Sequence, residues 1–349
     1  MSIILNIILF ILILGFIIFV HEFGHFTWAK ICGVYVYEFA LGMGPKLFGF
    51  TKGETDYSLR LIPIGGYCQL AGEDIDDDDK KKVPKNRRLQ SKTCFQRFLI
   101  MFWGAGNNFL SAFIILFFIA LIWGAAPLTP TITSVESGSA ADKAGIEVGD
   151  VVTEVNGHKI KTTDDLALYL AIADPKKETK ISVDRDGEDE TYKVKAVKVK
   201  ENGEERYKYG IGMQQEKEYG FVNSLKYMCG KSVSLFKQMF LTFGYLITGG
   251  IKLNQLSGPV GIYSVVGQTS KSGLASLLYL VAYLSINVGF INLLPLPAFD
   301  GGHILFIIIE KLRGKPVSPE LENKIHAIGL ILLLLLMVVV TVNDIIKLF

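Results

Sequence analysis

Residues 3–20 read IILNIILFILILGFIIFV and run without a break into His21-Glu22-Phe23-Gly24-His25. The apolar run contains one polar side chain, Asn6. About 20 apolar residues in a helix are enough to cross the hydrocarbon core of a bilayer. We therefore expect residues 1–26 to form a membrane-spanning helix. A cleaved signal peptide is disfavoured, because no Lys or Arg precedes Lys30 and the run ends in polar residues instead of a small-residue cleavage site.

Three more apolar stretches have a similar length, at about 98–124, 274–298 and 326–342. The chain has 349 residues, is 50% hydrophobic and has a mean hydropathy of +0.36. Because the apolar residues are concentrated in long runs, we expect a membrane α-helical fold with about four transmembrane helices. A fifth stretch, about 232–251, contains Lys237, Gln238 and several glycines, and suits an amphipathic helix at the membrane surface better than a span.

The basic residues indicate the orientation of these helices. The net charge of +2 carries little information, but Lys and Arg cluster between residues 30 and 97 and again between 311 and 324. With four spans, both regions lie on one side, which the positive-inside rule makes cytoplasmic. Both termini are then extracytoplasmic. Since flanking a span explains the basic cluster, we expect no nucleic-acid partner. The four cysteines lack CxxC spacing and are expected to be free thiols.

Residues 127–215 differ in composition from the rest of the chain. They are charged and contain short β-rich runs, the hairpin signal Asn156-Gly157 and an amphipathic stretch at 164–173. About 85 residues are enough to form a small core. We expect an extracytoplasmic α+β module, inserted between a first part of a membrane core (1–126) and a second part (216–349).

The residues that follow the first apolar run have the pattern His-Glu-x-x-His. Because helical residues four apart lie on nearly the same face, His21 and His25 can reach one metal ion. Imidazoles are zinc ligands, and a catalytic zinc keeps a position open for water. Glu22 lies to one side, where it can act as general base. Three ionisable groups in an apolar helix are costly unless a site uses them, so a packing role is disfavoured.

A zinc site of this kind needs a third protein ligand. Asp300, in Asn292-Leu-Leu-Pro-Leu-Pro-Ala-Phe-Asp300-Gly-Gly, is the best candidate. Its two prolines end a helix and fix an extended turn, and irregular backbone at membrane depth is tolerated only within protein or beside a water-filled cavity. Two alternatives stay open: Asp300 as the N-cap of the next helix, or His303 as the ligand, although a supporting role suits His303 better. His158 and His326 are expected to be outside the site.

A further segment, Tyr57–Ile64, partly alternates between polar and apolar residues and ends at Gly65-Gly66. It is expected to form a short strand or hairpin arm.

Together, these features resemble the site-2 protease family, and within it the bacterial regulator-of-sigma-E protease branch. The resemblance covers essentially the whole chain. It also includes FALGMGP at 39–45, IPIGGY at 62–67 and GAGNN at 104–108, and residues 137–157 look like part of a PDZ domain. Two departures are Ala105, where the family usually has Pro, and Phe299, where it usually has Leu; neither removes a reactive group.

The resemblance implies one zinc ion held by His21, His25 and Asp300, with Glu22 as the base. It also implies that Asn292 and Asn108 face the substrate or support the site. Residues 57–66, including Gly65 and Gly66, would form a membrane-associated β-hairpin that pairs with an extended substrate.

The implied protein is an intramembrane zinc metalloendopeptidase in the bacterial cytoplasmic membrane, with its active site near the cytoplasmic side. Its substrates would be single-pass membrane proteins already trimmed by another protease, such as anti-sigma factors, or remnant signal peptides. The PDZ-like module would screen them. A membrane metal transporter or sensor could use the same ligands but would not need Glu22. An inactive scaffold would not need an intact His-Glu-x-x-His motif.

Overall fold

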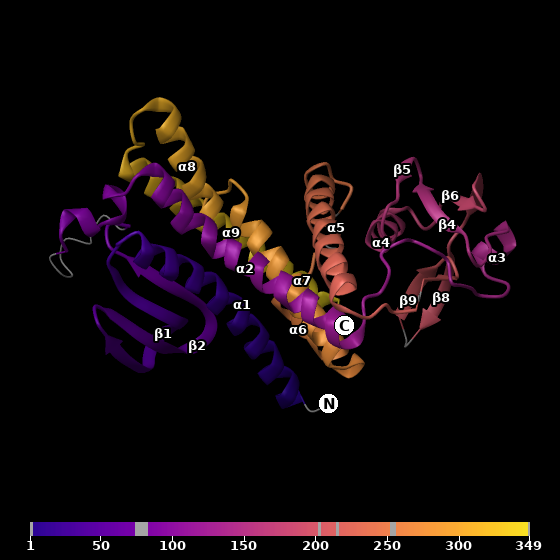
Figure 1. The fold of residues 1–349 in the computed structure, drawn as a ribbon, viewed down its shortest axis with the longest axis horizontal. Coiled ribbons are helices and arrows are strands. Elements are labelled where there is room, and N and C mark those ends of the chain that lie inside the picture. Colours follow the sequence, from indigo (N-terminus) through magenta and orange to yellow (C-terminus); the bar gives the residue numbers. More distant parts are fainter. Residues whose placement is uncertain (1–2, 74–82, 202–203, 214–215, 252–255, 348–349) are drawn as a thin grey trace. The chain divides into compact units, whose positions relative to one another are not determined.

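The computed structural model describes residues 3–73, 83–201, 204–213, 216–251 and 256–347. The chain divides into two compact units (Figure 1). The first, the membrane core, consists of Met1–Ile115 and Leu253–Phe349, and the second consists of Leu116–Lys252.

Four helices of the described chain are long and apolar enough to cross a membrane, which confirms the predicted number. They are α1 (Ile3–Ile31), α2 (Cys94–Trp123), α7 (Leu274–Leu293) and α9 (Pro319–Ile346). Two boundaries were wrong. α1 extends to Ile31, beyond the predicted end at residue 26, and α9 begins at Pro319, after the N-cap Ser318, instead of near His326. α7 ends at Leu293, before the prolines at 295 and 297, as expected from their effect on a helix.

Shorter helices complete the chain. α6 (Pro259–Thr269) and α8 (Asp300–Arg313) belong to the membrane core, and α5 (Phe221–Ile247) to the second unit. The stretch predicted at 232–251 is therefore the later part of a longer helix. Two of its residues, Val233 and Phe240, are well exposed.

Glycines let α1 and α2 approach each other closely. A Cβ on Gly24 would lie 1.9 Å from the backbone oxygen of Trp103, and a Cβ on Gly104 would lie 2.2 Å from Nε2 of His25. Beside this contact, the rings of Trp28 and Trp103 stack with centroids 5.4 Å apart. Because apolar side chains gain little by leaving lipid, small residues that permit close packing hold membrane helices together.

The short strand predicted at 57–64 is part of a larger sheet. β1 (Val36–Lys52) pairs antiparallel with β2 (Thr55–Leu70), and the sheet lies beside α1 (Figure 1). Residues 38–41 pair with 66–69 on one side and with 56–59 on the other, while 48–52 pair with 55–59. The segment at 56–59 therefore has partners on both edges. Within the described chain, residues 66–70 and residues 48–52 each have strand partners on one side only, so they form the two free edges of the sheet.

The second unit contains the expected α+β module. Its four-stranded sheet has the order β5-β4-β6-β7. The turn at Asn156-Gly157 joins β4 to β5, as predicted, and the helix expected at 164–173 is α4, with a capping box at Thr162. Buried apolar residues such as Val152, Leu166 and Ile181 form its core. The strands and helices of the module are β3 (Ser134–Val135), α3 (Ala140–Ala144), β4 (Val151–Val155), β5 (His158–Lys159), α4 (Thr163–Ile172), β6 (Thr179–Arg185), β7 (Glu188–Val194), β8 (Val197–Glu201), β9 (Glu204–Lys208) and β10 (Ile211–Gly212).

Within the second unit, the chain enters and leaves the α+β module at one place. Ala125 and Glu218 exchange two backbone hydrogen bonds, of 2.7 and 2.9 Å. After this bridge, α5 packs on α4, with Lys231 Nζ 2.6 Å from Asp164 Oδ1 and the hydroxyls of Ser234 and Thr162 2.9 Å apart. The module and α5 are therefore tied together by buried polar contacts.

Candidate metal centre

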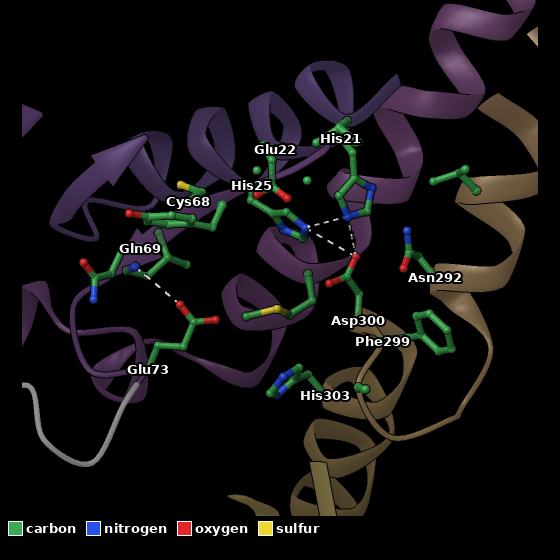
Figure 2. A pocket seen from close by; sticks show the side chains of 18 residues that line it. His21, Glu22, His25, Cys68, Gln69, Glu73, Asn292, Phe299, Asp300 and His303 are labelled. Carbon is green, nitrogen blue, oxygen red and sulfur yellow. Dashed lines mark hydrogen bonds and ion pairs between the residues drawn. The ribbon is translucent and has the colours of Figure 1, made fainter. Parts of the chain in front are cut away.

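His21, His25 and Asp300 lie together in the membrane core although the chain separates them widely. Asp300 Oδ2 is 3.2 Å from Nε2 of His21 and 3.3 Å from Nε2 of His25, and the two nitrogens are 3.3 Å apart (Figure 2). An ion held tetrahedrally by ligands about 2.0–2.1 Å away separates any two ligand atoms by about 3.3–3.4 Å. The triangle therefore fits zinc, and two imidazoles plus one carboxylate leave the fourth position open.

The second nitrogen of each imidazole has a partner of its own. His25 Nδ1 donates to the backbone oxygen of Ile100 at 2.9 Å, and His21 Nδ1 lies 3.4 Å from the amide of Asn108. The Asn108 oxygen otherwise has no partner. Since amide oxygen and nitrogen are assigned from the hydrogen-bond network, rotating this amide by half a turn lets its oxygen accept from His21 Nδ1–H. Both histidines then carry their proton on Nδ1 and offer Nε2 to a metal.

Gly104 makes room for these rings. Its own would-be Cβ would overlap His25 Nε2 and lie 3.0 Å from His21 Cε1. The sequence motif Gly-x-x-x-Asn therefore has two roles within one turn of α2. Gly104 leaves space for the imidazoles, and Asn108 is the hydrogen-bond partner of His21.

Asp300 is the first residue of α8. The preceding turn leaves α7 at Leu294, and a Cβ on Gly301 would lie 2.1 Å from the Leu294 oxygen, so only glycine fits there. The N-cap of α8 is Phe299, and no side chain caps the helix. The alternative in which Asp300 serves as the N-cap is therefore wrong.

The other histidines lie outside the triangle. His303 Nδ1 is 3.1 Å from Glu322 Oε1, and its ring stacks on His326 with centroids 3.9 Å apart. His158 stacks on Tyr169 in the α+β module. As expected, neither His158 nor His326 joins the three candidate ligands.

A cavity of about 750 Å³ opens beside the triangle. Glu22, Asn292, Gly65 and Gly66 line it together with the three candidate ligands, so the structure brings most of the predicted site residues to one place (Figure 2). Asn108 does not line the cavity and is fully buried against His21. Its position suits a supporting role better than contact with a substrate.

The free edge of β2 forms one wall of this cavity. This edge lies against Glu22, because a Cβ on Gly66 would lie 3.4 Å from Glu22 Cγ. The Leu70 N–H points to Glu73 Oε2 at 3.4 Å. Within the described chain all four cysteines are free, as predicted.

Tyr67, also on this wall, is a neutral hydrogen-bond donor. Burial and the hydrogen bond from its hydroxyl to Glu38, 2.7 Å long, raise the pKa of Tyr67 to about 12. It therefore cannot serve as a base near neutral pH.

Sequence reasoning missed Ile100, Cys68 and Glu73. Ile100 takes part through a backbone oxygen, which no side-chain pattern can reveal. Cys68 lies on the edge strand, and Glu73 lies just after it. The alternation of this strand continues past Gly65-Gly66, and this signal could have extended the predicted strand.

Comparison with known proteins places this geometry in context. The model of peptidase family M50 matches residues 9–336. The regulator of sigma-W protease RasP of Bacillus subtilis (strain 168) is 32% identical over 420 residues, which covers 99% of each chain. The putative zinc metalloprotease FN1322 of Fusobacterium nucleatum is 38% identical over 341 residues, covering 97% of this chain and 98% of its own. A putative zinc metalloprotease of Clostridium perfringens, CPE1693, is 38% identical over 331 residues and 95% of each chain.

The orientation of His21 by Asn108 can be tested through metal affinity. Replacing Asn108 with Ala removes the partner of Nδ1, and loss of such a partner typically weakens metal binding by about 10- to 100-fold. Competition with a chelator measures the zinc dissociation constant of the purified protein. Asn107→Ala is the matched control, because the Asn107 amide contacts the backbone oxygen of Val20 instead of a ligand. Wild-type affinity in Asn108→Ala would contradict the assignment.

Proposed function

Since the chain belongs to peptidase family M50 and is a membrane zinc metalloprotease, we propose that it hydrolyses peptide bonds in or near the transmembrane segments of other membrane proteins. His21, His25 and Asp300 would hold one zinc ion. The observation that supports this assignment most directly is the triangle of ligand atoms 3.2–3.3 Å apart. Two of the ligands, His21 and His25, lie on α1, which is long and apolar enough to span a membrane.

Glu22 is the proposed general base. Bound zinc would polarise the scissile carbonyl and lower the pKa of a water at the site. Glu22 lies in the same cavity, one residue after His21, where its carboxylate can take a proton from the attacking water and return it to the leaving amine. The Glu22 side chain lies against the cavity wall formed by β2, since a Cβ on Gly66 would lie 3.4 Å from Glu22 Cγ. A transporter or sensor has no use for such a base.

The substrate is proposed to bind as a strand along residues 66–70. A transmembrane helix must unwind before its carbonyl can be attacked, and unwound backbone in an apolar setting needs new hydrogen-bond partners. The edge proposed from the sequence, 57–64, is partly wrong, because 56–59 are paired on both sides. The free edge at 66–70 contacts Glu22 and therefore offers those partners next to the reacting groups.

The β1–β2 sheet is proposed to associate with the bilayer. It exposes large apolar side chains, among them Leu47, Phe48 and Leu61, at 60%, 66% and 55%. Such a surface is costly in water and favourable against lipid. The positive-inside rule places this sheet and the metal site toward the cytoplasmic face, with the α+β module and both termini outside.

The substrates are proposed to be single-pass regulatory proteins. One relative is named as a regulator of sigma-W protease, which suggests an anti-sigma factor-like substrate here. The α+β module, which resembles a PDZ domain, would admit substrates already trimmed by another protease.

Glu22→Gln separates metal binding from chemistry. Gln keeps the shape of Glu but cannot take a proton, so the variant should hold about one zinc per chain and lose cleavage by at least about 100-fold. Zinc content and cleavage of a single-pass membrane substrate are measured on purified wild type, Glu22→Gln and His25→Ala, the last of which should lose zinc. Cleavage by Glu22→Gln at the wild-type rate would refute its role as base, and wild type without zinc would refute the metal site.

Strand addition predicts an alternating requirement along the substrate. In a synthetic substrate, single ester linkages that replace one backbone N–H should slow cleavage at every second position near the scissile bond, where the N–H faces β2. The loss of one hydrogen bond corresponds to about 0.5–1.5 kcal/mol, or roughly 2- to 12-fold in kcat/KM. The intervening positions are the internal control, and a profile without alternation would exclude strand pairing.

Removal of the module should broaden substrate choice. Because Ala125 and Glu218 are hydrogen-bonded neighbours, a short Gly-Ser linker can replace residues 126–217 without separating these ends. The ratio of cleavage rates for trimmed and untrimmed substrate should fall toward one, at unchanged zinc content. An unchanged ratio would argue against a filter.

The proposed filter also requires the α+β module to lie on the extracytoplasmic side of the membrane. Cys229 is the exposed cysteine of the second unit, whereas the other three are partly buried in the membrane core. A membrane-impermeant maleimide added to intact cells should label Cys229, and protection of Cys229 would reverse the orientation.

A further inference from the structure

The turn that carries Asp300 is packed against the last span, α9. A Cβ on Gly329 of α9 would lie 2.2 Å from Pro297 Cβ and 2.8 Å from the Pro297 carbonyl carbon. On the other side, a Cβ on Gly302 would lie 2.6 Å from the Leu296 oxygen and 3.0 Å from His326 Cε1. The turn, α8 and α9 therefore meet without room for a methyl group at either glycine.

One hydrogen bond from α9 reaches the backbone of this turn. The N–H of Ala298 donates to Nδ1 of His326 at 3.2 Å. Ala298 has φ +74°, a left-handed conformation that is disfavoured for any residue with a Cβ. Ala298 lies two residues before Asp300. By holding the backbone of Ala298 in this conformation, His326 therefore also sets the direction in which the Asp300 carboxylate points.

His326 is itself held by α8. Its ring stacks on His303 with an interplanar angle of 14°, and His303 Nδ1 donates to Glu322, one turn before His326 on α9. Glu322, His303 and His326 thus form a chain of contacts that joins the two helices on either side of the turn.

These three residues also have ligand atoms within 4.8 Å of one another, so a second metal site has to be considered. The stacked rings argue against it. The nitrogen lone pairs of two stacked imidazoles lie in separate, nearly parallel planes and therefore do not converge on one ion. Both Nδ1 atoms are engaged as well, one with Glu322 and the other with the Ala298 N–H.

We propose that His326, with Gly329, positions Asp300 for zinc binding from α9, without touching the ion. This inference rests on the proposed metal site. It makes the affinity for zinc depend on a helix that contributes no ligand, through the conformation of Ala298. Loss of a residue that orients a ligand typically weakens metal binding by about 10- to 100-fold.

The test compares zinc dissociation constants, by chelator competition, in the full-length protein purified in detergent. His326→Leu should bind zinc about 10- to 100-fold more weakly. His326→Asn should stay close to wild type, because its Oδ1 can take the place of Nδ1 and accept from Ala298. Gly329→Ala should weaken binding as well, since it displaces Pro297. Gly15→Ala, on α1 with nothing within 4 Å of the added methyl, is the control and should bind as wild type.

Each outcome bears on the proposal. Equal affinity of His326→Leu and wild type, or equal losses in His326→Leu and His326→Asn, would overturn it. Two zinc ions per wild-type chain and one in His326→Leu would replace it by a second metal site. A wild type without zinc would overturn the metal site together with the inference, whereas zinc-loaded variants of equal affinity would overturn the inference alone. The melting temperatures of all variants show whether an altered affinity follows from loss of the fold.

Discussion

The structure depends on burying two imidazoles and a carboxylate inside a helical membrane protein without leaving any of them unpaired. Nε2 of His21, Nε2 of His25 and Oδ2 of Asp300 lie 3.2–3.3 Å apart and point at one another. In the absence of water, such groups are tolerated only when an ion or hydrogen bonds satisfy them. The glycine contact of α1 with α2, the proline turn after α7 and the backbone oxygen of Ile100 each contribute to meeting this requirement.

The sequence predicts the parts of this arrangement that are local. The spacing of His21 and His25 follows from the period of one helix, and the four spans follow from apolar runs. Asp300 could be predicted because two prolines and two glycines around a carboxylate are unusual at membrane depth. The sheet was only partly predicted: glycines at 42, 44 and 49 and Pro45 interrupt the alternation of β1, and its pairing on both sides of 56–59 depends on tertiary packing.

The contacts of Asn108, Ile100 and His326 illustrate what local patterns cannot supply. Each acts on a residue that is far away in the sequence, and two of the three interactions involve a backbone group. His326 was expected to be an ordinary histidine at the start of a span. Its contacts with Ala298 and His303 arise from the packing of α9 on the proline turn and on α8. Nothing in its own neighbourhood in sequence distinguishes it from a solvated side chain.

The paired backbone at Ala125 and Glu218 has a consequence for how such proteins change over evolutionary time. A segment whose two ends are hydrogen-bonded to each other can be lengthened, duplicated, exchanged or lost without moving the helices that it interrupts. Selection can therefore act on the inserted module separately from the zinc ligands. A lineage can acquire new targets by altering roughly a quarter of the chain, while the residues that perform hydrolysis stay as they are.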